Sequence, residues 1–401
     1  MDDILIVGGG PAGMIAGLLF ARAGLRTRVL EKHGDFLRDF RGDTVHPSTM
    51  EILDQLGLLE DFLARPHSRI TRASLRVEGV DYDIADLSKL DTPAPFIAMM
   101  PQWDFLDFVR RHALAHSTFS LEMESEATDF IEEAGRICGM RLRDGSERRA
   151  DVTIAADGRG SLVRREGILP LVEVGAPIDV FWFKLPKTDN QGDALRGGIS
   201  GGRMMVLIDR DDYWQAALVV AKGSADAVRA AGLPAMREAI TAMFPDVTIP
   251  EGVLVEDDEI KLLTVSLDRL ERWHRPGLLA IGDAAHAMSP VGGVGINLAV
   301  QDAVAAANAL AAPMEAGLDP DQRLRRVQAR REGPVKLAQA AQRMVQDKLI
   351  VPAIEGRVTA APTPLKMLNG LPWLRRIPGR LVGLGVRRER VRSPEIRPET
   401  R

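Results

Sequence analysis

The chain contains 401 residues, and its hydrophobic share of 45% and charged share of 27% are those of ordinary soluble globular proteins. The formal net charge of −4 gives no general reason to expect nucleic acid as a partner. Because Cys138 is the single cysteine, an intrachain disulfide and a cysteine metal cluster are excluded, and we interpret it as a packing residue. A strand pattern begins almost at once, with no signal peptide before it, so we expect a cytoplasmic protein.

The first segment is predicted to be a strand–helix–strand unit. Residues 4–7 (ILIV) form a short apolar run that is typical of a buried parallel strand. A helix is expected over residues 14–23 and a second strand over residues 26–30. Between the first strand and the helix lies a GxGxxG sequence that contains Gly8, Gly10, Pro11, Ala12 and Gly13. This arrangement is the dinucleotide-binding fingerprint in its expected context.

Each of the three glycines in this fingerprint is required for a physical reason. Gly8 permits a tight turn, Gly10 lets the backbone approach a pyrophosphate, and Gly13 lets the helix pack closely on the strand. The pyrophosphate would face the helix N-terminus, where free N–H groups and the helix dipole favour negative charge. Glu31, at the end of the second strand, can accept hydrogen bonds from the adenosine ribose, or it is a solvated acid at a strand end. Lys32 beside it is a further cofactor-binding candidate, or a surface lysine.

A polar loop precedes the next expected helix. Arg41, which is followed by Gly42, can bind a phosphate through two parallel hydrogen bonds, or it forms an ordinary surface ion pair. His46 is a candidate acid or base, or a histidine that hydrogen-bonds within its loop. The helix is expected to begin at Ser48, which together with Glu51 fits a capping box.

A third feature is an apolar strand that ends in an aspartate–glycine pair. The strand is expected over residues 152–156, and it delivers Asp157 and Gly158 at its tip. Such a carboxylate can meet a ribose or a phosphate-linked group. The simpler interpretation is a turn in which the aspartate caps the backbone.

Residues 170–275 change from strand–helix spacing to hydrophobic alternation, which is typical of antiparallel strands. Strands are expected over residues 180–185, 203–209 and 213–220, and a helix over residues 225–244. One face of this sheet could wall a pocket, and the candidate pocket residues are Trp182, Met205, Tyr213 and Trp214. For any single one of them, a place in the core is the favoured interpretation.

A second glycine-rich segment follows another buried strand, expected over residues 277–281. The strand ends at Gly282 and Asp283, where the carboxylate can meet a ribityl hydroxyl. The loop and the alanine-rich helix after it supply further candidates, namely Pro290, Gly293, Gly295, Ile296 and Asn297. Free N–H groups at this helix N-terminus would stabilise the negative edge of a reduced flavin. Because a nicotinamide-binding domain needs only the first glycine segment, the pair of segments favours FAD over NAD.

In this order, the three motifs resemble those of the para-hydroxybenzoate hydroxylase class of single-component flavoprotein monooxygenases. The resemblance covers residues 1–350 and rests on the GxGxxG unit, the Asp157–Gly158 pair and the segment around Asp283. It implies non-covalent FAD, reduction by NADH or NADPH, and dioxygen that forms a flavin C4a-hydroperoxide. This species would hydroxylate an aromatic or polyketide-like small molecule in a pocket that excludes water.

The resemblance also implies roles for individual residues. Asp157 and Gly158 would serve both FAD and the nicotinamide cofactor. The arginine loop beside the flavin, the FAD contact of the middle segment and the proline near the flavin map to Arg41 with Gly42, Gln102 and Pro290. The resulting candidates for a catalytic role are Arg41, His46 and Pro290. With only two tyrosines, the chain shows no evident tyrosine relay for deprotonating a phenol, and it is too short for the thioredoxin-like domain of some relatives.

We therefore expect an α/β fold with a Rossmann-like FAD-binding domain formed by residues 1–169 and 276–350. An antiparallel-sheet substrate domain would be inserted at residues 170–275. C-terminal helices and a basic segment would follow at residues 351–401. Between residues 366 and 392 the chain carries eight basic residues. Such a segment packs on the protein with a solvated basic face, or it makes weak contact with an anionic membrane.

Other functions remain open at this point. The main alternative is an FAD-dependent reductase of the geranylgeranyl-reductase kind, which saturates double bonds without inserting oxygen. A flavin halogenase would carry a Trp-x-Trp-x-Ile-Pro segment, which this chain lacks. A third alternative is a flavin-sensing or dinucleotide-binding protein that has a basic interaction tail and no enzymatic activity. Both a monomer and a homodimer are compatible with the sequence.

Overall fold

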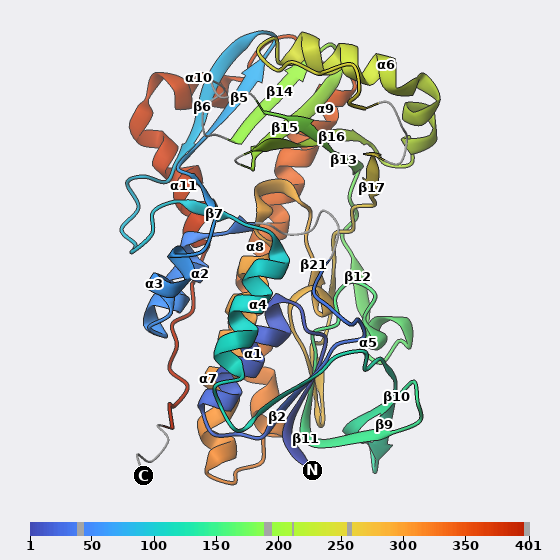
Figure 1. Cartoon of the computed structure of the whole chain (residues 1–401), viewed down its shortest axis with the longest axis vertical. Helices are drawn as coiled ribbons and strands as arrows, with labels where there is room; N and C mark the ends of the chain where they lie inside the picture. The colour runs from blue at the N-terminus through green and yellow to red at the C-terminus, as the bar shows by residue number, and fades with distance from the viewer. Residues whose placement is uncertain (38–43, 188–194, 211, 255–258, 397–401) are drawn as a thin grey trace.

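The computed structural model describes residues 1–37, 44–187, 195–210, 212–254 and 259–396. Two sheets lie toward opposite ends of an elongated molecule, and long helices run beside and between them (Figure 1). The N-terminus and the last described residues of the chain lie at the same end, beside the larger sheet.

The larger sheet consists of β1 (Asp2–Val7), β2 (Thr27–Leu30), β8 (Phe119–Glu122), β9 (Ala127–Glu133), β10 (Arg136–Leu142), β11 (Glu147–Ala155), β19 (His274–Arg275) and β20 (Leu278–Ala280). Its main strand order is β19-β20-β11-β1-β2-β8, and all of these neighbours except β19 and β20 pair in parallel. The β9–β10 hairpin pairs with the first half of β11. This is the parallel sheet that the first motif predicts, with β11 and β1 at its centre.

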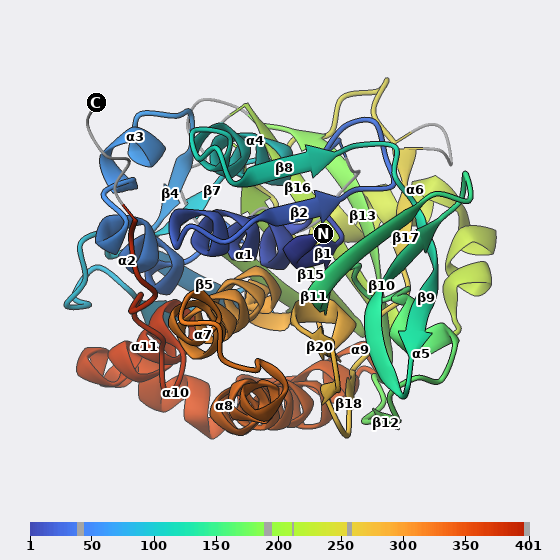
Figure 2. The ribbon, with the colours of Figure 1, turned by 90° about the horizontal axis from the view of Figure 1, so that it is seen from below.

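Helices α1 (Pro11–Arg22), α4 (Gln102–Ala113) and α7 (Gly295–Glu315) lie on one face of this sheet. Helix α8 (Asp321–Val345) packs on the outside of α7 (Figure 2). By composition α7 is long and apolar enough to cross a membrane, but 72% of its most apolar window is buried inside the protein. It therefore serves as the core helix of this unit, and its many alanines let it approach α1 closely.

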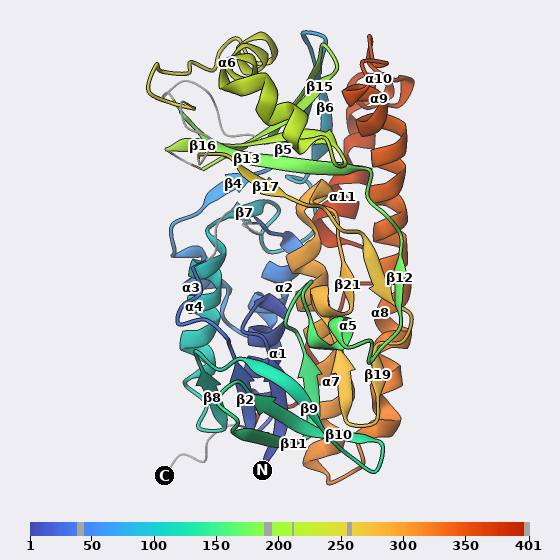
Figure 3. The ribbon, with the colours of Figure 1, turned by 90° about the vertical axis from the view of Figure 1, so that its right-hand side faces the viewer.

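The second sheet consists of β5 (Arg72–Val77), β6 (Val80–Asp86), β13 (Ile178–Pro186), β14 (Leu195–Ser200), β15 (Arg203–Asp209), β16 (Tyr213–Ala221) and β17 (Lys261–Leu263). Its order is β17-β13-β16-β15-β14-β5-β6. Helix α6 (Ala225–Met243) covers the outer face, and the inner face is turned toward the rest of the molecule (Figure 3).

The predicted insertion at residues 170–275 therefore supplies only part of the second sheet. Strands β5 and β6 lie within the stretch expected to form the first domain, and β14 pairs with β5 in parallel. The sheet is thus not purely antiparallel, and two separate stretches of the chain build it. Alternation along a short strand indicates that a strand exists, but it does not identify the partner strand.

Two three-stranded sheets link the larger units; they consist of β3 (Thr44–Val45), β7 (Ile97–Met99) and β4 (Ser68–Ile70), and of β12 (Leu171–Glu173), β18 (Asp268–Leu270) and β21 (His286–Ala287). Helix α2 (Pro47–Gln55) begins after His46, with Pro47 in its first turn and no side-chain cap. The capping box expected from Ser48 and Glu51 is wrong, because Ser48 lies within the helix and Glu51 pairs with Arg388. Proline at the first helical position takes the place of the cap, since its missing N–H would have no partner there.

The last part of the chain contains α9 (Val351–Ile354), α10 (Thr363–Gly370), the 3-10 turn η5 (Pro372–Arg375) and α11 (Arg376–Leu384). After α11 the chain runs back along the parallel-sheet unit. Glu389 pairs with Arg330 at 2.5 Å, Asn308 Nδ2 donates to the carbonyl oxygen of Arg390 at 2.8 Å, and Glu395 pairs with Arg22 at 2.8 Å. These contacts confirm a packed tail for this part of the basic segment.

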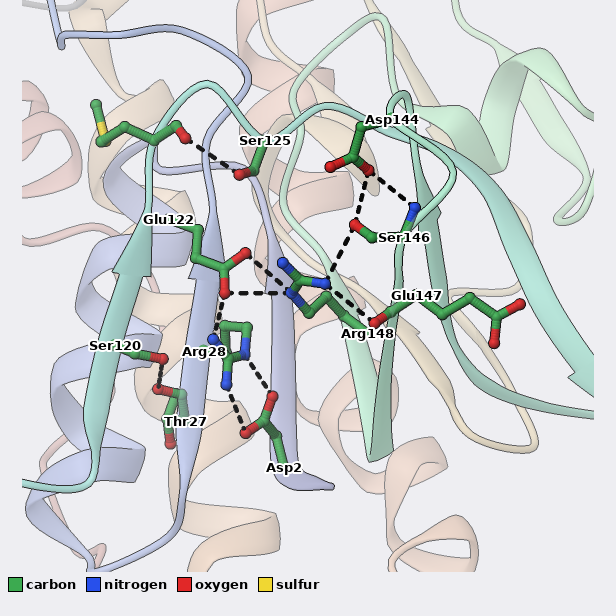
Figure 4. A network of polar contacts seen from close by, with 11 residues as sticks. Asp2, Thr27, Arg28, Ser120, Glu122, Ser125, Asp144, Ser146, Glu147 and Arg148 are labelled. Carbon is green, nitrogen blue, oxygen red and sulfur yellow. Dashed lines mark hydrogen bonds and ion pairs between the residues drawn. The ribbon is translucent and has the colours of Figure 1, made fainter.

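A polar network joins four strands of the larger sheet on the face opposite α1 (Figure 4). Arg28 of β2 pairs with Asp2 of β1 at 2.6 Å and with Glu122 of β8. Arg148 of β11 donates from Nε to Glu122 at 3.0 Å. Glu122 therefore serves two arginines at once, which stabilises the edge strand β8 against the centre of the sheet.

Replacing Glu122 with glutamine is expected to lower the free energy of unfolding by about 1–2 kcal/mol, because two partly buried guanidinium groups lose their shared carboxylate. Glu133→Gln is the matched control, since its pair with Arg149 is exposed and should contribute less than about 1 kcal/mol. Urea unfolding of both variants measures the difference. Equal effects would contradict a stabilising role for the network.

Candidate functional site

The glycine-rich loops from distant parts of the chain lie against one another. A Cβ atom added at Gly282 would lie 3.0 Å from the Cβ of Ala12 and 3.2 Å from that of Ala299. A Cβ atom at Gly8 would lie 2.5 Å from the carbonyl oxygen of Ala156, which directly precedes the aspartate–glycine pair. The GxGxxG turn therefore touches both other motifs, and the three together form one site.

The glycines of the first turn have different structural roles. Gly8 has a φ of +105°, and a Cβ atom at Gly13 would overlap the carbonyl oxygen of Gly8. Both are thus required by the protein itself. Gly10 adopts an extended conformation at the N-terminus of α1, and a Cβ atom there would meet nothing within 4 Å. Gly10 therefore keeps open the space in front of the helix N-terminus, where an anion is favoured.

Glu31 lies at the end of β2 beside this turn and is buried. Its carboxylate accepts hydrogen bonds from the backbone N–H of Gly9 at 3.0 Å and of His33 at 3.1 Å. These bonds fix its position, and a carboxylate retains further acceptor capacity for a ribose hydroxyl. The neighbouring Lys32 is exposed, as expected of a surface lysine.

An arginine that the sequence analysis missed joins the Asp157–Gly158 motif to the segment around Asp283. Arg159 donates from Nε to Asp283 at 3.2 Å and from Nη2 to the carbonyl oxygen of Met288 at 3.2 Å. Asp157 Oδ2 accepts a hydrogen bond from Leu162 N at 2.9 Å, so it caps α5 (Leu162–Arg165), while Oδ1 is buried without a partner among the described residues. Burial raises the pKa of Asp157 above its ordinary value. The sequence signal that could have identified Arg159 is its position directly after the Asp157–Gly158 pair.

The loop before α7 is held against the segment that leads into α2. Thr44 donates from Oγ1 to the carbonyl oxygen of Gly293 at 2.9 Å. Gly293 has a φ of +62°, which favours glycine, and Pro290 opens the turn that contains it. Helix α7 then begins at Gly295 with no side-chain cap, and Ile296 lies in its first turn. Its N-terminal N–H groups can therefore serve a bound acceptor.

His46 and Asn297 meet beneath this loop, and both are buried. Asn297 Oδ1 accepts hydrogen bonds from His46 N at 3.1 Å and from Thr49 Oγ1 at 2.7 Å. The His46 ring lies 2.8 Å from the carbonyl oxygen of Val382 through Nδ1. Because a carbonyl oxygen only accepts, Nδ1 carries the proton, and Nε2 is an acceptor in the neutral ring. Burial lowers the pKa of His46 from 6.5 to about 4, so the ring is neutral at pH 7.

The residues present fit a bound FAD. His46 Nε2 and Asn297 Nδ2 are buried polar atoms without a hydrogen-bond partner in the described part of the chain. Buried polar atoms are rarely left unpaired, so both point to a ligand at the start of α7. At the other end of the site, the open space at Gly10 suits a pyrophosphate.

The pKa of His46 leads to a pH-dependent stability. Between about pH 4 and pH 6.5 the unfolded chain binds a proton at this residue and the folded chain does not, so the free energy of unfolding decreases as the pH falls. The total loss from this residue is about 3 kcal/mol, of which about 2 kcal/mol falls between pH 7.5 and pH 5. Chemical unfolding of wild type and His46→Gln at pH 7.5 and pH 5 measures it. A smaller loss in the variant is expected, and an equal loss in both proteins would contradict this origin.

A buried ionic cluster of Asp302, His286 and Arg331 lies behind the segment around Asp283. Asp302 of α7 accepts hydrogen bonds from Gly282 N at 3.1 Å, from His286 Nε2 at 2.6 Å and from Arg331 Nε at 2.9 Å. Burial alone would raise the pKa of Asp302, but His286 and Arg331 hold it below its ordinary value. The cluster fixes the Gly282 backbone and thereby positions the adjacent Asp283.

The four aromatic and apolar candidates for a pocket wall lie on different faces of the second sheet. Met205 and Trp214 are fully buried beneath α6 on the outer face, so they are core residues there. Trp182 faces inward from β13, and its indole N–H is buried without a partner among the described residues. Tyr213 is partly exposed at the start of β16, with the Lys184 ammonium 4.8 Å from its ring centre.

Four cofactor candidates remain to be placed. Arg41 and Gly42 lie outside the described residues. Gln102 is the first residue of α4, close in sequence to Met99, whose register partner is Thr44. Gly158 has a φ of +80° directly after Asp157, and a Cβ atom there would meet nothing within 4 Å.

Comparison with known proteins agrees with this arrangement. The model of a family described as FAD binding domain matches residues 1–341. The 6-methylpretetramide 4-monooxygenase of Streptomyces rimosus is 30% identical over 90% of this chain and 87% of that protein. An uncharacterized aromatic compound monooxygenase of Bacillus subtilis, YhjG, is 25% identical, and the match spans 60% of its length. The crystal structure of p-nitrophenol 4-monooxygenase from Pseudomonas putida superposes with a TM-score of 0.78 at 20% identity, covering 97% of this chain and 99% of that one, and so confirms the fold.

Proposed function

Because this chain belongs to the FAD binding domain family of flavin-dependent monooxygenases, we propose that its substrate is an aromatic or polyketide-like small molecule. It is an FAD-dependent oxidoreductase, with NADH or NADPH as reductant. The names of two related proteins, 6-methylpretetramide 4-monooxygenase and para-nitrophenol 4-monooxygenase, support this substrate class. The single observation that carries the proposal is the contact between the three motifs, from which we infer one elongated site along β1, β11 and the start of α7.

At the nucleotide end, this chain's residues bind and orient the cofactor. The N-terminus of α1 at Gly10 would hold the pyrophosphate, and Glu31 would accept hydrogen bonds from the adenosine ribose. Asp283 would bind the ribityl chain, with Arg159 holding its carboxylate in place. Asp157 and Gly158 lie beside this position at the tip of β11, and we propose that they contact FAD and the nicotinamide cofactor.

At the flavin end, the backbone supplies the main contacts. The N–H groups of Gly295, Ile296 and Asn297 at the start of α7 would stabilise negative charge on the ring edge. Pro290 and Gly293 would shape the loop that lies along the ring. When bound, FAD supplies the reactivity toward NAD(P)H and dioxygen. Neutral His46 would accept a proton or a hydrogen bond at Nε2, and we propose Arg41, Gly42 and Gln102 as further contacts.

The overall reaction consumes one dioxygen and one NAD(P)H with a proton for each substrate, and it yields the hydroxylated product, NAD(P)⁺ and water. We propose that the inner face of the second sheet, with Trp182, forms the wall that keeps water from the reacting atoms. The unpaired Trp182 indole N–H can donate to a substrate oxygen. We also propose a cytoplasmic location, where NAD(P)H is available.

Replacing Asp283 with alanine is expected to weaken FAD binding by about 10- to 100-fold without unfolding the chain, since one charge-assisted hydrogen bond to the ribityl chain is lost. Flavin absorbance per chain after purification measures occupancy. Asp226→Ala, at a fully exposed site, is the matched control. If Asp283→Ala purifies with full flavin content, the ribityl assignment is wrong.

The proposed reaction is tested by measuring NADH and NADPH consumption with a panel of phenols and polycyclic aromatic compounds, together with peroxide and product mass. A substrate that speeds up cofactor oxidation and gains one oxygen atom is expected. Product formation without oxygen would instead select the FAD-dependent reductase of the geranylgeranyl-reductase kind. Flavin binding without NAD(P)H oxidation under any condition would contradict both enzymatic functions.

A further inference from the structure

The C-terminal helix α11 packs on the protein through glycines and exposes two large apolar side chains. A Cβ atom at Gly379 would overlap the backbone of Asp86, and one at Gly383 would lie 2.9 Å from Leu90. The helix therefore rests on the protein through glycines. Ile377 and Leu381 lie about 200° around the helix from these glycines, at the same four-residue spacing. Most helices at a protein surface bury their large apolar side chains, whereas α11 buries Leu384 but turns Ile377 and Leu381 outward.

The outward apolar side chains are extensively exposed. Ile377 is 61% exposed and Leu381 43%, and Trp373 in η5, four residues before Ile377, is 64% exposed. Met367 and Leu371 continue the exposed series through α10 and the turn after it. A run of exposed apolar groups of this extent marks an interaction site rather than scattered surface residues.

Basic side chains flank the apolar ones. Arg376 and Arg380 are exposed neighbours of Ile377 and Leu381 along α11, and Lys366 is exposed on α10. Within the described part of the chain these three side chains form no ion pair. No aspartate or glutamate occurs between residues 363 and 388. The surface formed by α10, η5 and α11 thus combines apolar and cationic groups, and we call it the C-terminal surface.

We propose that the C-terminal surface docks on the anionic face of a lipid bilayer. Large apolar side chains with tryptophan enter the interface, while arginine and lysine bind acidic headgroups. A second copy of the chain is a less suitable occupant, because a two-fold interface would bring two copies of this cationic surface together, and residues 363–388 contain no carboxylate to offset the arginines. Helix α11 also contacts the proposed FAD site, because the Val382 carbonyl oxygen accepts a hydrogen bond from His46 Nδ1. This surface is independent of the proposed substrate.

Vesicle co-sedimentation of the FAD-loaded enzyme tests the proposal. Wild type is expected to bind vesicles of phosphatidylcholine with phosphatidylglycerol far more tightly than vesicles of phosphatidylcholine alone, and to be released by salt. Arg376→Gln/Arg380→Gln should bind about 20- to 30-fold more weakly, at roughly fivefold for each charge. Ile377→Ser/Leu381→Ser should also lose binding. Arg325→Gln/Arg326→Gln, two exposed arginines on α8, is the matched control and should bind like wild type.

Three results would overturn the proposal: no binding of wild type to acidic vesicles, equal binding to both kinds of vesicle, or undiminished binding of the charge variant. Light scattering without lipid tests the other candidate occupant, a second copy of the chain. A dimer of wild type that becomes monomeric in Ile377→Ser/Leu381→Ser would show that a second copy covers this surface. Flavin content of each variant verifies that the chain has folded, so a loss of binding cannot come from unfolding.

Discussion

Replacing Gly10 with valine is expected to abolish FAD binding and to leave the fold intact. A Cβ atom at this position meets no protein atom within 4 Å, and the backbone there is extended, which valine adopts without strain. The added methyl groups would instead occupy the space in front of α1. An overpacked contact that cannot relax costs about 3 kcal/mol or more, so binding should weaken by at least about 100-fold. Flavin absorbance and titration with added FAD measure the effect.

Two other glycines provide controls for this variant. Gly252→Val, where a Cβ atom also meets nothing within 4 Å, should retain full flavin content. Gly13→Val should fail to fold, because its side chain would overlap the carbonyl oxygen of Gly8. If Gly10→Val purifies yellow and binds FAD normally, the pyrophosphate does not lie at the N-terminus of α1.

The second large effect is expected for Arg331→Leu in the buried cluster behind Asp283. The Arg331 side chain is 1% exposed, and its removal leaves Asp302 buried without its guanidinium partner. Loss of one partner of a buried ion pair costs about 3–5 kcal/mol. Arg331 also lies 3.6 Å from Glu389, so the tail should become accessible to protease. Urea unfolding and limited proteolysis measure the two consequences.

A double variant separates the buried charge from packing. Asp302→Asn/Arg331→Met removes both charges, and it should recover part of the stability lost in Arg331→Leu. Arg325→Leu on the exposed side of α8 should change stability by less than about 0.5 kcal/mol. If Arg331→Leu also changed the free energy of unfolding by less than about 0.5 kcal/mol, the cluster would not stabilise the protein.

Local sequence patterns were sufficient to predict much of the parallel-sheet unit. β1, α1 and β2 match the predicted segments closely, because their turn, helix start and strand residues lie within one continuous stretch. Hydrophobic alternation likewise predicted β15 with its bounds, Arg203–Asp209. Each of these elements is specified by spacing that neighbouring residues carry.

Features that depend on distant residues could not be predicted in this way. The pairing of β5 with β14 joins segments more than a hundred residues apart, and no local pattern specifies it. Alternation also gave no indication of which sheet face α6 would cover, so Met205 and Trp214 were candidates for the pocket although they lie in the core. Asp302 and Arg331 had no motif of their own, and only their contacts with Gly282 and His286 show their role.

Hydrogen–deuterium exchange of the apoprotein with and without FAD tests most directly whether the three motifs surround one cofactor. The account predicts that one FAD per chain slows exchange together in residues 8–14, 157–162 and 282–298, while exposed α6 is unchanged. Protection of residues 8–14 alone, with the other two segments unaffected, would contradict a shared site.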